Sequence, residues 1–400
     1  MSRKKVVIVS QHYPPDASTT AAIMAAIATE LAQHCEVVVL SGTGRSAVAA
    51  DPHLPRVVEI KNWIPAKAAL VRRAMAELLF TVNMFFALLR RLRRGDVALT
   101  VTAPFALPYA VAAASRLKRA RSVLIMHDLF PEVLVIAGLL KRRSALTRLI
   151  RLANRWMFRA LDAVVVIGRD TEQLLARYGE AIRGKMHFIP NWTTLTPAIR
   201  PISDDNPYRK RCDSDFVVGL SGNLGFTHDP LVVFEAARLL SEDRSIHFLL
   251  SGWGIGFEKL KALQAEARLP NVTLVDRVAD GELDLLLSAA DLWVIPYRSD
   301  VAGVSIPSRF YNLLATGRPV VLVSEAYSEA ALTISENRLG WVVAPGRPAE
   351  LAEAIGEASR QPDPGISARA VTIAANFSQQ RAMAAYRELI STLLRAGSTP

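Results

Sequence analysis

Three segments in the second half of the sequence combine glycine with hydroxyl residues in a way suited to phosphate binding. Residues 221–225 and 251–256 each follow a run of residues typical of a strand. Glycine lets backbone N–H groups approach an anion closely, and a helix N-terminus adds partial positive charge. Residues 303–309 end in Arg309, whose planar guanidinium can hold a diphosphate. Together the segments predict a nucleoside diphosphate site.

Six residues of these segments are expected to contact the diphosphate: Gly222, Gly225, Gly252, Ser305, Ser308 and Arg309. Residues 252–256 read G-x-G-x-G rather than the G-x-G-x-x-G of dinucleotide-binding folds, which disfavours NAD. Two alternatives stay open. Any turn between a strand and a helix can hold two glycines, and Arg309 could be an ordinary surface charge.

A histidine and an aspartate, His127 and Asp128, follow the apolar run at 122–126. Residues just beyond the carboxyl end of a parallel strand lie at the cleft where such sheets bind ligands. A carboxylate there could stabilise an oxocarbenium-like transition state or act on the hydroxyl group of an acceptor. We predict that His127 and Asp128 are catalytic. The alternative is a capping aspartate beside a half-buried histidine.

These segments lie in two series of short β-branched runs that alternate with longer helical patterns, which is typical of parallel βαβ units. A linker rich in proline separates the two series at residues 190–207. We therefore expect an α/β protein of two doubly wound, Rossmann-like domains that face each other across a cleft. The strands are expected at 6–9, 37–40, 97–101, 122–126, 163–167 and 186–189, and at 216–221, 247–251, 272–275, 292–295, 319–323 and 340–343.

The positive charge of the chain is concentrated in its first half. Residues 1–200 contain 29 Lys and Arg against 13 Asp and Glu, a net charge of +16, whereas the whole chain carries +11. The sequence has no zinc-finger spacing, RRM-like aromatic signature or basic tail, which argues against nucleic acid as a partner. An anionic membrane surface fits better, because each nearby Lys or Arg contributes roughly 1 kcal/mol. A solvated basic surface is the alternative.

Two helical segments of this half favour the membrane. Residues 74–89 are apolar but shorter than the ~20 residues of a spanning helix, so we expect an interfacial helix, with a buried core helix as the alternative. Its expected lipid-facing rings are Phe80, Phe85 and Phe86, and its flanking charges are Arg72, Arg73, Arg90, Arg91, Arg93 and Arg94. In residues 139–160, helical spacing places Arg148, Arg151, Arg155 and Arg159 on one stripe. This pattern predicts a basic amphipathic helix, with an ordinary surface helix as the alternative.

The two cysteines and the first residues indicate the compartment. Cys35 and Cys212 fall in different expected domains, so they form no disulfide framework and imply a reducing environment. The charges at residues 3–5 resemble the start of a signal peptide, but Pro14 and Pro15 interrupt the apolar core that must follow. We expect a cytoplasmic protein, peripheral on the inner face of the plasma membrane.

The motifs resemble those of the bacterial family-4 retaining glycosyltransferases of GT-B fold, especially the subgroup that assembles exopolysaccharide and O-antigen units. In the second half the resemblance rests on 221–225, 251–252, 271–272, 289–291, 307–309, 315–321, Gly340 and 345–346. In the first half it rests on 13–15, 127–132 and 189–192. It implies an acceptor-binding, membrane-facing domain at 1–200, a nucleotide-sugar domain at 208–375, and a helix at 376–400 that packs back on the first domain. It also implies a functional histidine at His127.

The chain departs from the family pattern at several positions. Val304 and Asn312 stand where many members have two glutamates eight positions apart, so we expect Asn312 and Glu329 to contact the donor instead. Asn223 and His228 lie nearest the usual phosphate-binding Arg and Lys, and Asn223 is taken as a further donor contact. A glycine-rich pair in the first loop is replaced by residues 18–20, whose hydroxyls could cap a helix.

The resemblance implies transfer of a hexose or N-acetylhexosamine unit from a nucleoside diphosphate sugar, with UDP-sugar expected, to a polyprenyl diphosphate-linked saccharide. No metal or other cofactor is expected, because helix dipoles and backbone amides can hold the leaving diphosphate. Two alternatives remain, a nucleotide-sugar epimerase of the same architecture and a catalytically silent subunit of a polysaccharide assembly complex. The basic amphipathic first half speaks against the epimerase.

Overall fold

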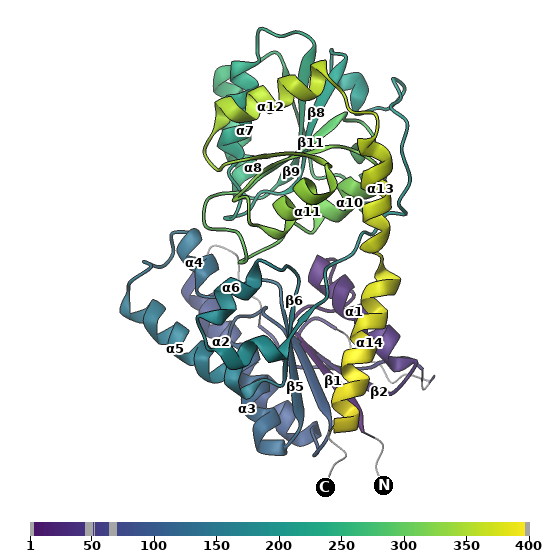
Figure 1. Ribbon diagram of the computed structural model, residues 1–400. Helices are drawn as coiled ribbons and strands as arrows, with labels where there is room; N and C mark the ends of the chain where they lie inside the picture. Colours follow the sequence, from purple (N-terminus) through teal and green to yellow (C-terminus); the bar gives the residue numbers. More distant parts are fainter. Residues whose placement is uncertain (1–3, 45–50, 52, 64–69, 397–400) are drawn as a thin grey trace.

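The computed structural model describes residues 4–44, 51, 53–63 and 70–396 and contains two parallel sheets (Figure 1). Their strand orders are β3-β2-β1-β4-β5-β6-β7 and β10-β9-β8-β11-β12-β13. In the first sheet the strand order reverses between β1 and β4, and in the second it reverses between β8 and β11. This order confirms the predicted pair of doubly wound domains of GT-B fold. The first sheet comprises β1 (Lys5–Ser10), β2 (Glu36–Ser41), β3 (Arg56–Glu59), β4 (Val97–Val101), β5 (Arg121–Met126), β6 (Ala163–Val166) and β7 (Met186–Phe188).

The second sheet comprises β8 (Phe216–Asn223), β9 (Ile246–Trp253), β10 (Val272–Asp276), β11 (Leu292–Pro296), β12 (Val320–Val323) and β13 (Gly340–Val343). Every strand expected from the sequence is present, with bounds that differ by a few residues. The sequence interpretation missed β3, because this edge strand is only four residues long and its side chains are partly or fully exposed. An edge strand of this kind lacks the buried apolar run that marks a central strand.

Helices cover both faces of the first sheet. One face packs against α1 (Thr19–Ala32), and the other packs against α2 (Leu70–Arg91), α3 (Leu107–Lys118) and α5 (Ala145–Ala160). The side chains of β1 alternate between the two layers: Val6 and Ile8 point to the α1 side, Val7 and Val9 to the α2 side. The shorter helices of this domain are α4 (Glu132–Ile136), α6 (Thr171–Ala176) and the 3₁₀ helix η1 (Glu180–Lys185).

The second sheet is covered in the same way. One layer contains α7 (Pro230–Leu239), α8 (Ile255–Ala267) and α12 (Pro348–Arg360). The other contains α9 (Leu283–Leu287), α10 (Arg309–Ala315), α11 (Glu329–Asn337) and α13 (Ile366–Asn376), and η2 (Arg209–Arg211) and η3 (Asp280–Glu282) complete the domain. Strands buried on both faces read as continuous apolar runs, which is why they were recognisable from the sequence.

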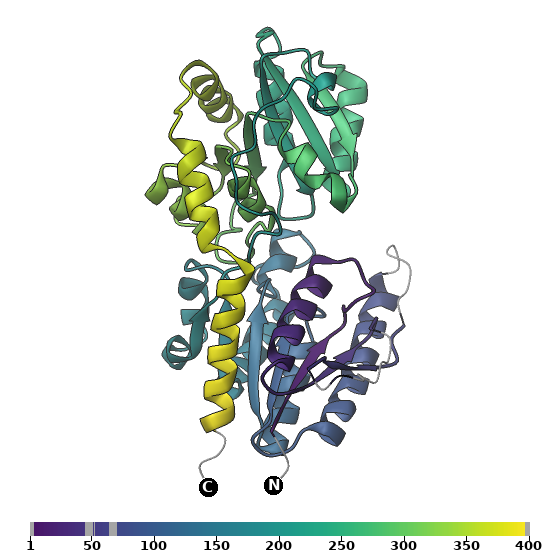
Figure 2. The same cartoon turned by 90° about the vertical axis from the view of Figure 1, so that its right-hand side faces the viewer.

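The chain crosses between the domains twice, and the crossings lie side by side where the N–H of Thr193 donates to the carbonyl of Phe377 at 3.0 Å. After the second crossing, α14 (Gln379–Ala396) runs along the first domain, as Figures 1 and 2 show. Its residues Met383, Tyr386 and Ile390 are buried in the same cluster as β1 and α1. The last helix of the chain is therefore part of the first domain's core.

A loop after β11 joins the two domains. Val304 of this loop is buried in the first domain's core beside Leu129, and its carbonyl accepts the N–H of Leu129 at 3.2 Å. On the neighbouring connection, Asp170 accepts the N–H groups of Gly303 and Glu329 at 2.7 and 3.0 Å. Contacts of this kind hold the carboxyl ends of the two sheets against each other.

Exposed apolar side chains form a stripe on each of two helices of the first domain. On α2 the stripe is Met75, Leu78, Leu79, Val82 and Phe86, each at least 43% exposed. On α5 it is Leu146, Leu149, Leu152 and Trp156, each at least 48% exposed. The expectation that Phe80 faces lipid is wrong: Phe80 is buried in the core, because it lies on the side of α2 that packs on the sheet. Within the described ranges, every helix is too short or too polar to cross a membrane.

Candidate active site

The predicted phosphate-binding loops meet at the carboxyl ends of β8 and β9. Gly222 has a φ of 141°, and the space beside its Cα is taken by Arg309, whose Nε would lie 3.2 Å from an added Cβ. Gly252 faces Gly222 across the strand pair, and a Cβ there would lie 2.3 Å from the carbonyl oxygen of Gly222. The two glycines therefore let the strands and the Arg309 side chain come close together.

Arg309 is held over this junction by polar and aromatic contacts. Its Nη1 donates to Oγ of Ser221 at 2.7 Å, and its guanidinium lies 5.6 Å from the ring centroid of Trp253. Arg277 lies 4.7 Å from the same ring. No carboxylate of the described residues forms an ion pair with Arg309, and burial lowers the pKa of its guanidinium to about 10. A partly buried cation without an ion-pair partner is suited to an anionic ligand.

Two of the predicted donor residues line open space near this junction. A Cβ added at Gly225 would meet no atom within 4 Å, and Asn223 is exposed at the end of β8 with its amide oxygen close to Gly254. Ser308 is exposed immediately before α10. The structure thus brings Gly222, Asn223, Gly225, Gly252, Ser308 and Arg309 to one end of the second sheet.

The predicted catalytic pair faces these loops from the first domain. His127 and Asp128 follow β5, and the Asp128 carboxylate interacts with the hydroxyl of Ser305, which belongs to the second domain. Burial raises the pKa of Asp128, while the bond from Ser305 opposes this rise. The backbone N–H of Asp128 donates to Oγ1 of Thr102 at 3.3 Å. Asp128 is thereby fixed at the point where the domains meet.

His127 has a polar atom that the protein leaves unused. Its Nε2 is buried and has no hydrogen-bond partner among the described residues. Burial lowers the pKa of the imidazole to about 4, so the ring is neutral at neutral pH. A neutral imidazole with one unused nitrogen can donate or accept a hydrogen bond to a ligand at this position.

Asn312 and Glu329, the other two predicted donor residues, have hydrogen-bond partners within the protein. The Asn312 amide oxygen accepts the N–H of Thr194 at 2.8 Å and the hydroxyl of Thr193 at 2.9 Å. It therefore holds the linker between the domains. The Glu329 carboxylate accepts the backbone N–H and the Nε of Arg169 at 2.7 and 2.9 Å. Both side chains therefore make contacts that connect the second domain with the linker or the first domain. Such contacts depend on how the two domains are placed, which could not be predicted from the sequence.

Three features of the site were missed in the sequence. Trp253 lies within the predicted loop at 251–256, but no role was predicted for it. Its aromatic ring attracts the guanidinium groups of Arg277 and Arg309 by cation–π interactions. Arg277 directly follows β10, as His127 follows β5, but the predicted strand ended one residue too early to mark it. Val304 replaces a family glutamate because its side chain is buried among apolar residues of the first domain. A carboxylate there would be buried without a partner.

Comparison with known sequences identifies the family of this α/β chain. The family described as "Glycosyltransferase Family 4" matches residues 21–196, and "Glycosyl transferases group 1" matches residues 215–361. The first match spans β2 to β7, and the second spans all six strands of the second sheet. The chain belongs to the family-4 glycosyltransferases. This placement favours a glycosyltransferase over the epimerase alternative.

Two relatives of this glycosyltransferase come from bacteria. It is 28% identical to the "Probable glycosyltransferase WbjE" of Pseudomonas aeruginosa over 293 residues, 73% of each chain. It is 25% identical over 276 residues to the "Putative colanic acid biosynthesis glycosyl transferase WcaI" of Escherichia coli, 67% of each chain.

Solved structures share the fold of this glycosyltransferase over nearly its whole length. The Anabaena protein Alr3699/HepE in complex with UDP superimposes with a TM-score of 0.68 at 17% identity, covering 98% of this chain and 100% of that one. The α,α-trehalose-phosphate synthase (UDP-forming) of Burkholderia vietnamiensis gives a TM-score of 0.66 at 14% identity, with 99% of each chain covered. These likenesses establish a GT-B fold.

Proposed function

We propose that this glycosyltransferase moves a hexose or N-acetylhexosamine unit from a UDP-sugar to a lipid-linked saccharide during synthesis of a cell-surface polysaccharide. The contact between Asp128 and Ser305 carries the proposal, because it unites the predicted catalytic residue with the predicted donor loop. The HepE structures contain UDP, glucose or UDP-glucose, and the relative WcaI is named for colanic acid biosynthesis. Both point to this donor and this product class.

In the proposed reaction, the diphosphate of the donor lies over Gly222 and beside Arg309. The bond between the anomeric carbon and the diphosphate breaks, and a hydroxyl oxygen of the acceptor takes its place on that carbon. Arg309 stabilises the charge that develops on the leaving diphosphate. Asp128 stabilises the positive charge on the sugar or receives the proton of the hydroxyl, and the unused Nε2 of His127 bonds the sugar. Family membership favours retention of the anomeric configuration.

The first domain provides the surface for a lipid-linked acceptor. The exposed stripes of α2 and α5 belong to one helical layer, since α3 packs against both helices. Exposed Arg90, Arg93 and Arg94 follow the α2 stripe, and exposed Arg148, Arg155 and Arg159 accompany that of α5. Apolar stripes with basic flanks are typical of helices that lie in a membrane interface. We propose that this layer rests on the inner face of the plasma membrane, where it reaches an acceptor that cannot leave the bilayer.

Incubation with nucleotide sugars, with and without a lipid-linked acceptor, tests the proposal. We expect sugar transfer only when the acceptor is present, and the anomeric configuration of the product, measured by NMR, should match that of the donor. Conversion of the donor to its epimer would contradict the proposal. Binding of UDP-sugars without transfer to any acceptor would indicate a catalytically silent subunit.

A further inference from the structure

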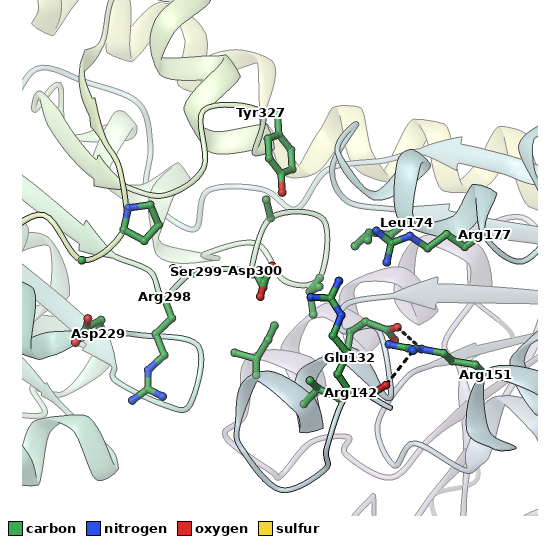
Figure 3. A pocket seen from close by; sticks show the side chains of 16 residues that line it. Glu132, Arg142, Arg151, Leu174, Arg177, Asp229, Arg298, Ser299, Asp300 and Tyr327 are labelled. Atoms are coloured by element: carbon green, nitrogen blue, oxygen red, sulfur yellow. Dashed lines mark hydrogen bonds and ion pairs between the residues drawn. The ribbon is translucent and has the colours of Figure 1, made fainter. Parts of the chain in front are cut away.

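A cavity of about 540 Å³ lies between the domains, away from the donor loops that follow β8 and β9 (Figure 3). Its first-domain wall comes from α4, α5 and α6 and the connection between α4 and α5. Its second-domain wall comes mainly from residues that follow β11, β12 and β13. The donor loops at Gly222 and Gly252 follow β8 and β9, on the other half of the sheet. None of the predicted donor residues lines the cavity.

Four arginines line this cavity, and they come from both domains. Arg151 is paired with Glu132 at 3.0 Å, and the Nε of Arg298 donates to a backbone carbonyl at 3.0 Å. The side chains of Arg142 and Arg177 form no ion pair or hydrogen bond with the part of the chain that the structure describes. Figure 3 shows both side chains extending from the first domain into the space below Tyr327. These two guanidinium groups are available to a ligand.

The carboxylates of the cavity do not cancel this charge. Glu132 is used by Arg151, and Asp229 caps α7 by accepting the N–H of Leu231 at 3.2 Å. Asp300 is the remaining carboxylate among the lining residues. Its four arginines and three carboxylates leave the cavity a net charge of +1, and the arginines without partners carry that excess. A group with several oxygens and a double negative charge, such as a diphosphate, matches paired guanidinium groups.

The surroundings of the cavity favour a lipid diphosphate over a free one. Val135 and Ile136 of α4 form part of the wall. Leu139, which lies between α4 and α5, is 52% exposed, and the exposed stripe of α5 starts at Leu146. Helix α5 thus presents Arg151 to the cavity and its apolar stripe to the outside. An amphiphilic ligand could place its charged group in the cavity and its hydrocarbon chain along α5.

We propose that this cavity binds the diphosphate of the lipid-linked acceptor, with Arg142 and Arg177 as its principal ligands. The inference rests on the proposed function, since it assumes a lipid-linked acceptor. Val304 lines the cavity, and its neighbour Ser305 bonds to Asp128. A saccharide attached to the bound diphosphate can therefore extend toward the reacting residues. No bond is made or broken at the cavity itself.

Calorimetric titration of the full chain tests this site, with inorganic pyrophosphate and geranyl diphosphate as probes and saturating UDP to occupy the donor loops. We expect both probes to bind, and geranyl diphosphate to bind more tightly. The double variant Arg142→Gln/Arg177→Gln should lose about tenfold or more in affinity for both, because it removes charge-assisted hydrogen bonds. Arg143→Gln is the matched control, since this exposed neighbour carries the same charge but does not line the cavity.

The outcomes separate the site from the proposed function. No binding of either probe, or equal weakening by Arg143→Gln, would overturn the cavity site. Equal affinity for the two probes would overturn its assignment to a lipid. UDP affinity should be unchanged in all these variants, and Arg309→Ala should weaken UDP binding while leaving geranyl diphosphate binding in place. Failure to bind UDP or to transfer sugar would instead count against the proposed function.

Discussion

At the scale of single residues, the site is defined by polar groups that the protein leaves without partners of its own. Arg309 is partly buried and forms no ion pair with a described carboxylate, and His127 has a buried nitrogen without a hydrogen bond to a described residue. Burial of such groups costs free energy unless a ligand compensates. Groups of this kind mark candidate ligand-binding positions in both domains.

Arg309→Ala should weaken the binding of UDP. If the guanidinium forms a charge-assisted hydrogen bond with the diphosphate, its loss should cost ~1–3 kcal/mol in binding free energy. Calorimetric titration with UDP measures this directly. Arg244→Ala provides the control, because Arg244 is exposed before β9 at the opposite end of the sheet. Unchanged UDP affinity in Arg309→Ala would remove this residue from the donor site.

His127→Ala and Asp128→Asn should each lower turnover by at least ~100-fold, the usual scale for a lost acid–base or electrostatic group. The fold and UDP affinity should be retained, since neither change creates a large cavity. Steady-state kinetics and thermal unfolding of the same preparations test both statements. Normal turnover in both variants would show that the catalytic assignment is incorrect.

The pH dependence of turnover gives an independent test of Asp128. Its carboxylate is the form that we expect to be active, and burial raises its pKa. Turnover should therefore rise with pH through a pKa above the ordinary value for aspartate, and Asp128→Asn should abolish this limb. His127 should add no limb near the usual histidine pKa, because its pKa is lowered to about 4. A limb that persists in Asp128→Asn would have to be assigned to another group.

At the scale of elements, the strands and the loops after them could be predicted from the sequence. The hydrogen bonds that side chains form between the domains could not. Buried parallel strands have continuous apolar runs, so β8 and β9 and the glycines beyond them could be located. Asn312 and Glu329 were expected at the donor, but they bond to Thr194 and Arg169 from the linker and the first domain. Such contacts depend on how two domains are placed, which local sequence patterns do not encode.

The helical layer that carries the α2 and α5 stripes should bind anionic vesicles. Electrostatic attraction would recruit it and apolar side chains would insert, so binding should weaken with added salt. Changing Arg90, Arg91, Arg93 and Arg94 to Gln should reduce binding further. Vesicle flotation with neutral and anionic lipid measures the effect. Equal binding to both kinds of vesicle, or to neither, would favour an acceptor that is not in a membrane.

At the scale of the whole molecule, Asp170 and Arg169 connect the domains by contacts of very different expected strength. Asp170 is buried and accepts two backbone N–H groups of the second domain. Arg169 also pairs with Glu336, which is half exposed, at 3.1 Å. Buried donors that lose their acceptor are costly, whereas exposed ion pairs contribute little.

Asp170→Ala should therefore lower the free energy of unfolding by about 1–3 kcal/mol, because it leaves two buried N–H groups without an acceptor. It should also reduce turnover, because the same contact fixes the backbone at Gly303, two residues before Ser305. Glu336→Ala should change stability by less than about 1 kcal/mol. Denaturant titration and kinetics of the two variants make the comparison. Similar effects of both changes would mean that the contact of Asp170 does not hold the domains together.

The return of α14 to the first domain has a consequence for how the protein is made. During synthesis, the residues of β1 and α1 leave the ribosome long before Met383, Tyr386 and Ile390, against which they are buried. Domains usually fold as units with the earlier one first. Here the earlier domain keeps an uncovered apolar face until α14 has been synthesised. A chain without α14 would have a damaged first domain and an intact second one, and the nascent chain is a natural client for chaperones until α14 is made.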